Sequence, residues 1–205
     1  MGIGLKIIYA LAGLCGVAVL VLLLSSSLLK PEPFGPAIAP DPVAHRDPIV
    51  QIYGADVWGV RGRFAIHTWV ATKGLDEPSY TIYQVIGWQL RRKGTAVSVE
   101  SSIQPNRPWF RSPPILLYEQ RGSGVEHLVE AIAEAAAAYP FAREYVMWPG
   151  PNSNSFTQWI ISRVPGLNVE LPAKAIGKNW MADYLATAST AELASLSPVE
   201  TITDL

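Results

Sequence analysis

The sequence predicts an α+β domain preceded by one apolar helix that is long enough to span a membrane. Two observations predict this class. Along residues 49–182, five strand-like runs are followed by a helix, one short strand and a second helix, which is not the regular alternation of a parallel α/β fold. Only 16% of the 205 residues are charged, and the shortfall lies in the first thirty residues. We therefore expect an antiparallel sheet packed with two main helices behind a transmembrane helix.

Residues 1–29 are interpreted as an uncleaved transmembrane signal anchor. Every residue of Ile7–Leu24 is apolar, glycine or tyrosine, and a helix of this length spans about 27 Å, close to the hydrocarbon core of a bilayer. A cleaved signal has a shorter core that ends at a small-x-small site. The one plausible site, at residues 37–39, lies far downstream. Cys15 follows the bulky Leu14, so we interpret it as a membrane-buried thiol rather than a lipidation site.

The charges on the two sides of this span scarcely define its orientation. Lys6 and the α-amino group precede it, while Lys30 and Arg46 follow it. A head as short as residues 1–5 usually stays in the cytosol, so the rest of the chain is expected on the outer side. Residues 30–48 contain six prolines and are expected to form a stiff, extended spacer.

The domain itself is expected over residues 49–182, with a flexible tail of small and polar residues over 183–205. Lys93 and Gly94 are interpreted as a hairpin tip between its third and fourth strands. The five strands are predicted at Ile49–Tyr53, Arg63–Ala71, Tyr80–Leu90, Ala96–Ser101 and Ile115–Tyr118.

Two helices are predicted in the second half of the domain. The run Val125–Ala138 is rich in Ala and Glu, and Pro140 ends it. A short strand is expected at Arg143–Trp148, and the Pro-Gly-Pro turn that follows leads into a helix from about Ser153 to Arg163. Residues 167–180 are expected to be irregular.

Charge and residue types exclude several classes of function. Sixteen basic residues against 17 acidic ones give a net charge of −1, without the basic excess that binding nucleic acid would need. The three histidines, His45, His67 and His127, are scattered and no cysteine pair accompanies them, so we expect no metal site. The chain has no glycine-rich phosphate loop and no Gly-x-Ser-x-Gly elbow, so we expect no cofactor and no α/β-hydrolase fold.

The block Trp-Pro-Gly-Pro-Asn-Ser-Asn-Ser-Phe at residues 148–156 is the most distinctive part of the chain. A structural interpretation explains it, because Pro-Gly-Pro makes a rigid turn and Asn and Ser are preferred helix N-caps. A functional interpretation makes Ser153 a nucleophile at a helix N-terminus, where N–H groups and the helix dipole stabilise negative charge. The residue types alone favour the structural interpretation.

Together with His-Thr-Trp at 67–69 and Ala-Ile-Gly-Lys at 175–178, this block resembles a bacterial membrane-anchored family of unknown function. The signature of that family is Trp-Pro-Gly-Pro-Asn-Ser-Asn-(Thr/Ser)-Phe, and the resemblance covers roughly residues 50–180. It implies an uncharacterised cell-envelope protein that crosses the bacterial inner membrane once and holds its domain in the periplasm. It implies no established activity.

The chain order also resembles the circularly permuted papain-like hydrolases, which include NlpC-like, lecithin:retinol acyltransferase-like and PPPDE proteins. In those proteins an early strand carries a His, and a later Asn-Cys-Asn-x-Phe block opens a helix. Residues 152–156 are similar to that block with Ser153 in place of the nucleophilic Cys, and His67 is similar to the early His. The resemblance implies a permuted papain-like fold in which His67 is the base and Gln84, on the next strand, orients it. A serine depends on its base and oxyanion site more than a cysteine does.

Aromatic residues indicate where a ligand would bind. Seven tryptophans are many for a domain of this size, and Trp109 stands in a loop beside Arg111, a pair that suits a sugar or a lipid head group. Alternatively, the loop folds over its own hydrophobic cluster. Together with Trp148, Asn152 and Asn154, which flank Ser153, these residues make up the predicted binding site.

Two functions fit the sequence. The first is a hydrolase or acyltransferase that acts on an amide or ester of the cell wall or of a lipid, with Ser153, His67 and Gln84 as catalytic residues. The second is a non-catalytic envelope module that binds peptidoglycan, lipid or a membrane partner. The sequence does not decide between them, and the expected partners are the lipid bilayer and peptidoglycan or lipid.

Overall fold

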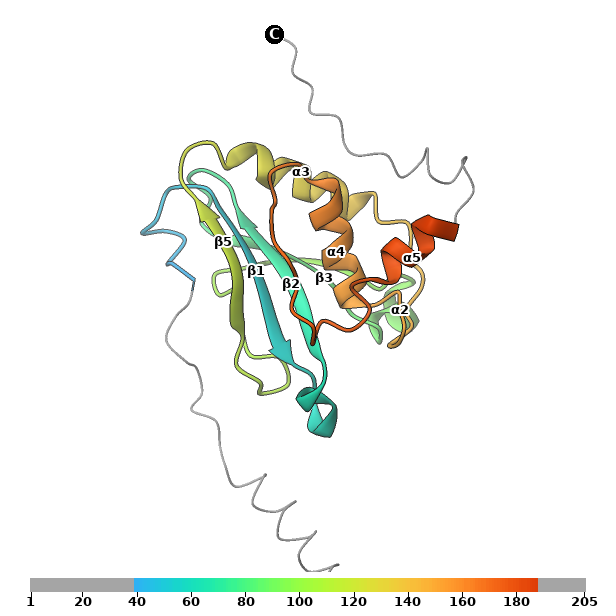
Figure 1. Ribbon diagram of the computed structural model, residues 1–205. Coiled ribbons are helices and arrows are strands. Elements are labelled where there is room, and N and C mark those ends of the chain that lie inside the picture. The colour runs from blue at the N-terminus through green and yellow to red at the C-terminus, as the bar shows by residue number, and fades with distance from the viewer. Residues whose placement is uncertain (1–38, 188–205) are drawn as a thin grey trace, which may run out of the picture. The chain divides into compact units, whose positions relative to one another are not determined.

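The computed structural model describes residues 39–187 (Figure 1). The predicted membrane anchor, residues 30–38 of the predicted spacer and the tail from residue 188 lie outside the described residues. Among the helices of residues 39–187, none is both long and apolar enough to cross a membrane. All described residues belong to one compact unit.

A five-stranded sheet forms the centre of the domain, in the order β4-β3-β2-β1-β5 (Figure 1). Every pair of neighbouring strands is antiparallel, which confirms the predicted α+β class and its antiparallel sheet. All five predicted strands are present, because their β-branched and aromatic residues alternate between the two faces of the sheet. The strands are β1 (Ile49–Asp56), β2 (Ile66–Lys73), β3 (Tyr80–Val85), β4 (Val97–Ser102) and β5 (Ile115–Arg121).

Two main helices, α3 (Glu126–Ala137) and α4 (Ser153–Arg163), cover one face of the sheet (Figure 1). The larger hydrophobic cluster joins these helices to the strands and includes Ile52, Ile132 and Phe156, all fully buried. Three short helical segments complete the domain: η1 (Gly59–Arg63, a 3-10 turn), α2 (Gln89–Lys93) and α5 (Trp180–Thr187). The last of these crosses residue 183, where the tail was expected to begin.

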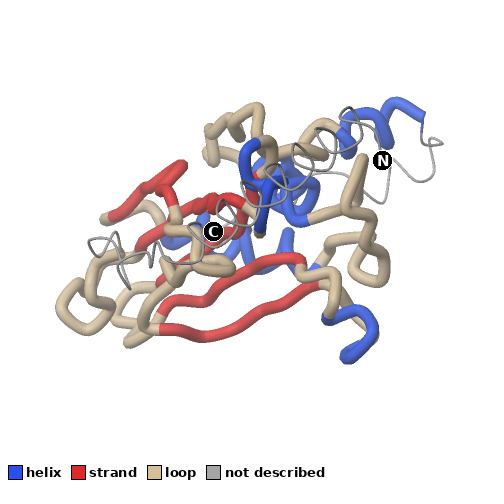
Figure 2. The backbone as a smooth tube through the Cα atoms, turned by 90° about the horizontal axis from the view of Figure 1, so that it is seen from below, coloured by secondary structure: helices blue, strands red, loops and turns tan. Residues whose placement is uncertain are grey.

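The opposite face of the sheet carries a smaller cluster that includes Tyr53, Trp69 and Tyr80. Successive residues of β2 point to opposite faces, so Thr68 faces α4 while Trp69 faces this smaller cluster. Loops and turns, drawn in tan in Figure 2, form a large part of the domain. Two of the longest cover residues 103–114 and 164–179.

Two sequence predictions about the third strand are wrong. The strand ends at Val85 rather than at Leu90, and the expected hairpin tip is the helical turn α2. Gly94 closes this turn in the left-handed conformation, with a φ angle of 71°, and accepts no side chain without strain. The arginines and the lysine of α2 are exposed, as expected of a solvated charge run.

The predicted strand at Arg143–Trp148 is also wrong, since this segment forms turns and bends. Its backbone bonds go to loops, with Val146 N–H donating to Pro151 O at 2.8 Å. The apolar side chains that favoured a strand, Tyr145, Met147 and Trp148, instead line a cavity. The run of four apolar residues at 145–148 therefore contributes to the wall of a cavity and not to a strand.

Candidate functional site

The N-terminus of α4 is held by a capping box. The side-chain Oδ1 of Asn152 accepts hydrogen bonds from the backbone N–H groups of Asn154 at 2.9 Å and Ser155 at 3.2 Å. In return, the backbone N–H of Asn152 donates to Ser155 Oγ. The residue types of this block thus have the structural role that they predicted.

The amide groups of Asn152 and Asn154 also tie the helix to the rest of the domain. Asn154 Nδ2 donates to the carbonyl oxygens of Ile66 (3.0 Å) and Ile176 (2.8 Å). Asn154 Oδ1 accepts from Thr68 Oγ1 at 2.9 Å. Asn152 Nδ2 donates to Ile176 O as well. Both side chains were predicted to bind ligand. Their polar groups fix the start of α4, Asn154 against β2 and Asn152 against the loops at Met147 and Ile176.

Ser153 is the first residue of α4, and it is buried beside a cavity. Among residues 39–187, neither its hydroxyl nor its backbone N–H has a hydrogen-bond partner. The sequence predicts that the N–H groups at the start of this helix hold an oxyanion. The N–H groups of Asn154 and Ser155 are bound by Asn152 and so are not free for this role. The Ser153 N–H remains available, at the positive end of the helix dipole.

His67 lies on β2 with its imidazole hydrogen-bonded to Gln84 of β3. Nε2 of His67 lies 3.1 Å from Gln84 Oε1, and Gln84 Nε2 donates to Glu100 Oε1 at 3.0 Å. The second bond fixes the orientation of the Gln84 amide, so its oxygen faces the imidazole. Because that oxygen can only accept, Nε2 of His67 carries the proton and Nδ1 keeps a lone pair. Within the described part of the chain, Nδ1 has no hydrogen-bond partner.

The surroundings of His67 keep it uncharged. Burial lowers its pKa to about 4, and the hydrogen bond with Gln84 only partly offsets this effect. The ring of Trp109 stacks on the imidazole, with ring centroids 3.7 Å apart and planes within 6°. At neutral pH the imidazole is therefore a proton acceptor rather than a cation.

One cavity of about 430 Å³ brings the predicted residues together. Ser153, His67, Trp109 and Trp148 all line it, as do the two asparagines of the capping box. No hydrogen bond joins Ser153 to His67 within residues 39–187. By the alternation along β2, His67 lies on the face that carries Trp69, on which its ring stacks, while α4 covers the other face.

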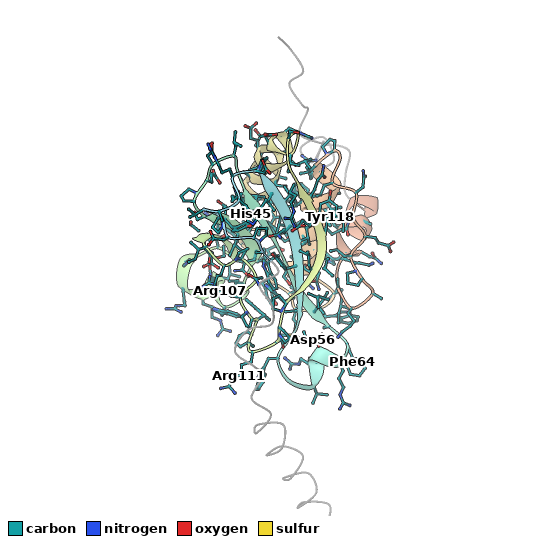
Figure 3. The ribbon with its side chains drawn as sticks, turned by 90° about the vertical axis from the view of Figure 1, so that its left-hand side faces the viewer. His45, Asp56, Phe64, Arg107, Arg111 and Tyr118 are labelled. Atoms are coloured by element: carbon teal, nitrogen blue, oxygen red, sulfur yellow. The ribbon has the colours of Figure 1, made fainter. Side chains whose placement is uncertain are left out.

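Two predicted residues lie outside this lining. Gln84 lines a second cavity of about 260 Å³, which also contacts Glu100, Arg107 and Trp109. Arg111 is exposed and lines neither of these two cavities. In Figure 3, Arg111 and Phe64 lie toward the same end of the domain.

Sequence reasoning missed the residues that make the cavity apolar. Most of its wall consists of aromatic and aliphatic side chains, and several of them are strongly exposed. Trp58 and Trp88 stand beside glycines in irregular or short helical segments, which is a sequence signal for an aromatic residue outside the core. Glu100 was missed too, because nothing in the sequence pairs it with Gln84. Among the described residues, no three side chains of His, Cys, Asp or Glu are grouped so that they could hold a metal ion.

Comparison with known proteins gives a family but no activity. No curated protein and no solved structure matches the chain. One family model, described as "Protein of unknown function (DUF3750)", matches residues 47–180. This region contains all of the residues that line the two cavities. Since the match covers well over half of the sequence, the chain belongs to the DUF3750 family.

Proposed function

We propose that this protein is a membrane-anchored hydrolase or acyltransferase of the bacterial cell envelope, with Ser153 as its nucleophile and a permuted papain-like arrangement of the site. The observation that carries the proposal is the cavity shared by Ser153, at a helix N-terminus, and His67, whose proton Gln84 holds on Nε2. A nucleophile, a base and a group that orients the base are the parts that such chemistry requires.

In the proposed reaction, Ser153 Oγ attacks the carbonyl carbon of an ester or amide while its proton passes to His67 Nδ1. The Ser153 N–H and the dipole of α4 stabilise the oxyanion. The bond to the leaving group then breaks, and the leaving alcohol or amine takes the proton from His67. Water or an acceptor alcohol attacks the acyl-serine in the second half of the reaction. His67 lies on the face of β2 that carries Trp69, whereas α4 covers the other face, so the reaction requires the two side chains to approach each other through the cavity that both line when substrate binds.

The test is labelling of purified residues 36–205, a compact unit that contains both hydrophobic clusters, with a fluorophosphonate that reacts with activated serines. We expect labelling of the wild-type protein and at least a 100-fold slower reaction in the Ser153→Ala and His67→Ala variants. Ser162→Ala is the matched control, since this exposed serine of α4 lies outside the cavity lining. Equal labelling of wild type and Ser153→Ala would contradict the proposal.

A non-catalytic binding module is the second candidate, and the missing hydrogen bond between Ser153 and His67 favours it. If the cavity only binds, the fluorophosphonate leaves wild type unlabelled and Ser153→Ala retains the cellular role of the protein. Loss of the cellular role in Ser153→Ala, with an unchanged circular dichroism spectrum, would exclude this candidate.

The role of Gln84 can be tested without any activity. In Gln84→Glu a carboxylate replaces the amide oxygen beside His67 Nε2, so the pKa of His67 is expected to rise by about 1–3 units from its low value. The rise follows because an anion stabilises the imidazolium. NMR titration of the histidine ring signals, assigned with His67→Gln, measures it.

The matched control is the exchange Gln84→Glu with Glu100→Gln. It removes the repulsion between two neighbouring carboxylates and restores an amide donor at the position of Glu100. This double variant should show the same rise. An unchanged pKa of His67 in both variants would show that Gln84 does not hold the imidazole in solution.

A further inference from the structure

The wall of the 430 Å³ cavity consists mostly of aromatic and aliphatic side chains. Arg61 is the one charged residue in its lining. The amide groups of two polar lining residues, Asn152 and Asn154, already donate hydrogen bonds to backbone carbonyl oxygens of the protein. A sugar or a peptide would bury many polar groups here without partners, at a cost of about 1–3 kcal/mol for each. The lining therefore disfavours peptidoglycan and favours a hydrocarbon chain.

Around the cavity stands a group of exposed apolar side chains, which we call the apolar rim: Trp58, Phe64, Trp88, Phe110, Met147 and Trp148. The exposed fractions are high, at 73% for Trp58, 68% for Phe64 and 71% for Trp148. Contiguous exposed apolar groups of this kind mark sites that contact a membrane, a ligand or another protein. Tryptophan in particular is enriched where proteins meet the bilayer interface.

A cation accompanies the apolar rim. Arg61 lies in η1, between Trp58 and Phe64, and makes no ion pair among the described residues. Within the described part of the chain, its guanidinium makes only a weak hydrogen bond, to the sulfur of Met147 at 3.8 Å. Arg63 of the same turn is exposed as well. A guanidinium without a partner beside exposed aromatics suits a bilayer that carries anionic phosphate head groups.

We infer that the cavity binds the acyl chain of a membrane lipid and that the apolar rim docks on the lipid surface, with Arg61 facing the head groups. The inference deepens the proposed function and rests on it, because it makes the ester or amide attacked by Ser153 that of a lipid acyl group. The Ser153 hydroxyl then lies in the wall of the chamber that holds the chain. The predicted anchor at residues 1–29 would keep the domain within reach of its substrate.

Binding of cis-parinaric acid, a fluorescent C18 fatty acid, to residues 36–205 tests the acyl site directly. Wild type is expected to bind it, palmitate to compete and hexanoate not to compete. Ala65→Trp adds a large ring to the lining and should weaken binding at least tenfold. Ser162→Ala, at an exposed residue outside the lining, should bind as wild type does. Absence of binding, or equal binding by Ala65→Trp, would overturn the inference.

Docking is tested by sedimentation with vesicles of phosphatidylethanolamine and phosphatidylglycerol in a ratio of 3:1. The double variant Trp58→Ser with Phe64→Ser is expected to lose at least 90% of the vesicle-bound fraction. Ile103→Ser is the control, since Ile103 is 67% exposed but lies outside the cavity lining. Vesicle binding that is equal in the double variant and in wild type would overturn the docking role of the rim.

The two proposals fail in different ways. If fluorophosphonate leaves Ser153 unlabelled while parinaric acid binds, the chemistry is wrong and the acyl site stands. If Ser153 is labelled but parinaric acid does not bind, the protein is a hydrolase of another substrate class, and this inference is wrong.

Discussion

Lowering the pH from 7 to 4 is expected to remove about 3 kcal/mol of the domain's stability through His67 alone. The pKa of His67 falls from its usual 6.5 to about 4 in the folded protein because the imidazole is buried. Between these values the unfolded chain binds a proton that the folded chain does not, so acid favours unfolding. This loss of stability begins as the pH falls below about 6.5 and is complete below about pH 4. Urea unfolding of residues 36–205 at pH 7, 5.5 and 4.5 measures it.

The control for this prediction is His67→Gln, which cannot take up a proton at this position. Carboxylates elsewhere titrate in both proteins, so the difference between wild type and variant isolates the histidine. We expect the stability of wild type to fall more steeply with acid than that of His67→Gln, by about 2 kcal/mol between pH 7 and pH 4.5. Parallel pH dependence in the two proteins would show that His67 is not held neutral by burial.

The low pKa of His67 that destabilises the domain in acid also has a functional consequence. A histidine that protonates only near pH 4 remains a proton acceptor throughout the physiological range. Gln84 bonds the Nε2 nitrogen, so Nδ1 of this neutral imidazole keeps its lone pair. If the protein is a hydrolase, its rate should therefore hold down to about pH 5, well below the point where an ordinary histidine loses activity.

Local pattern was enough to predict most of the secondary structure. The five strands and the helices α3 and α4 carry strong periodicity and clear end signals, such as the Asn152 cap that opens α4 at Ser153. The failures lie where tertiary packing decides. Residues 145–148 form an apolar run like that of a short strand, but three of them line a cavity. The start of α5 follows a segment with no helical signal.

The candidate site could be predicted only in part, for a related reason. Ser153, His67 and Gln84 were predicted from the order of motifs along the chain, an early histidine followed by a late Asn-Ser-Asn block. The hydrogen bond between His67 and Gln84 agrees with the orienting role predicted for Gln84. Glu100 meets Gln84 because β4 pairs with β3. The apolar rim gathers residues from four segments outside the strands, near residues 58–64, 88, 110 and 147–148. No local pattern records such a meeting. The sequence likewise did not show that the side-chain amide of Asn154 would bond to the backbone of β2.

Gly177→Ala is expected to destabilise the domain by about 3 kcal/mol and to distort the start of α4. Gly177 has a φ angle of +89°, which costs a residue with a Cβ about 1–2 kcal/mol. An added Cβ would also lie 2.7 Å from the backbone oxygen of Pro149 and would overlap the amide of Asn152. Relieving such a clash costs typically a further 1–3 kcal/mol. Urea unfolding measures the loss, and the fluorophosphonate reaction reports on Ser153.

Gly94→Ala is the matched control, because Gly94 also has a positive φ angle, of +71°, but an added Cβ there meets no atom within 4 Å. It should lose only the conformational part, about 1 kcal/mol, and leave Ser153 unaffected. The excess loss in Gly177→Ala therefore measures how tightly residues 175–177 press on the Asn152 cap. Equal losses in the two variants would mean that this segment yields easily, and that the capping box holds α4 without it.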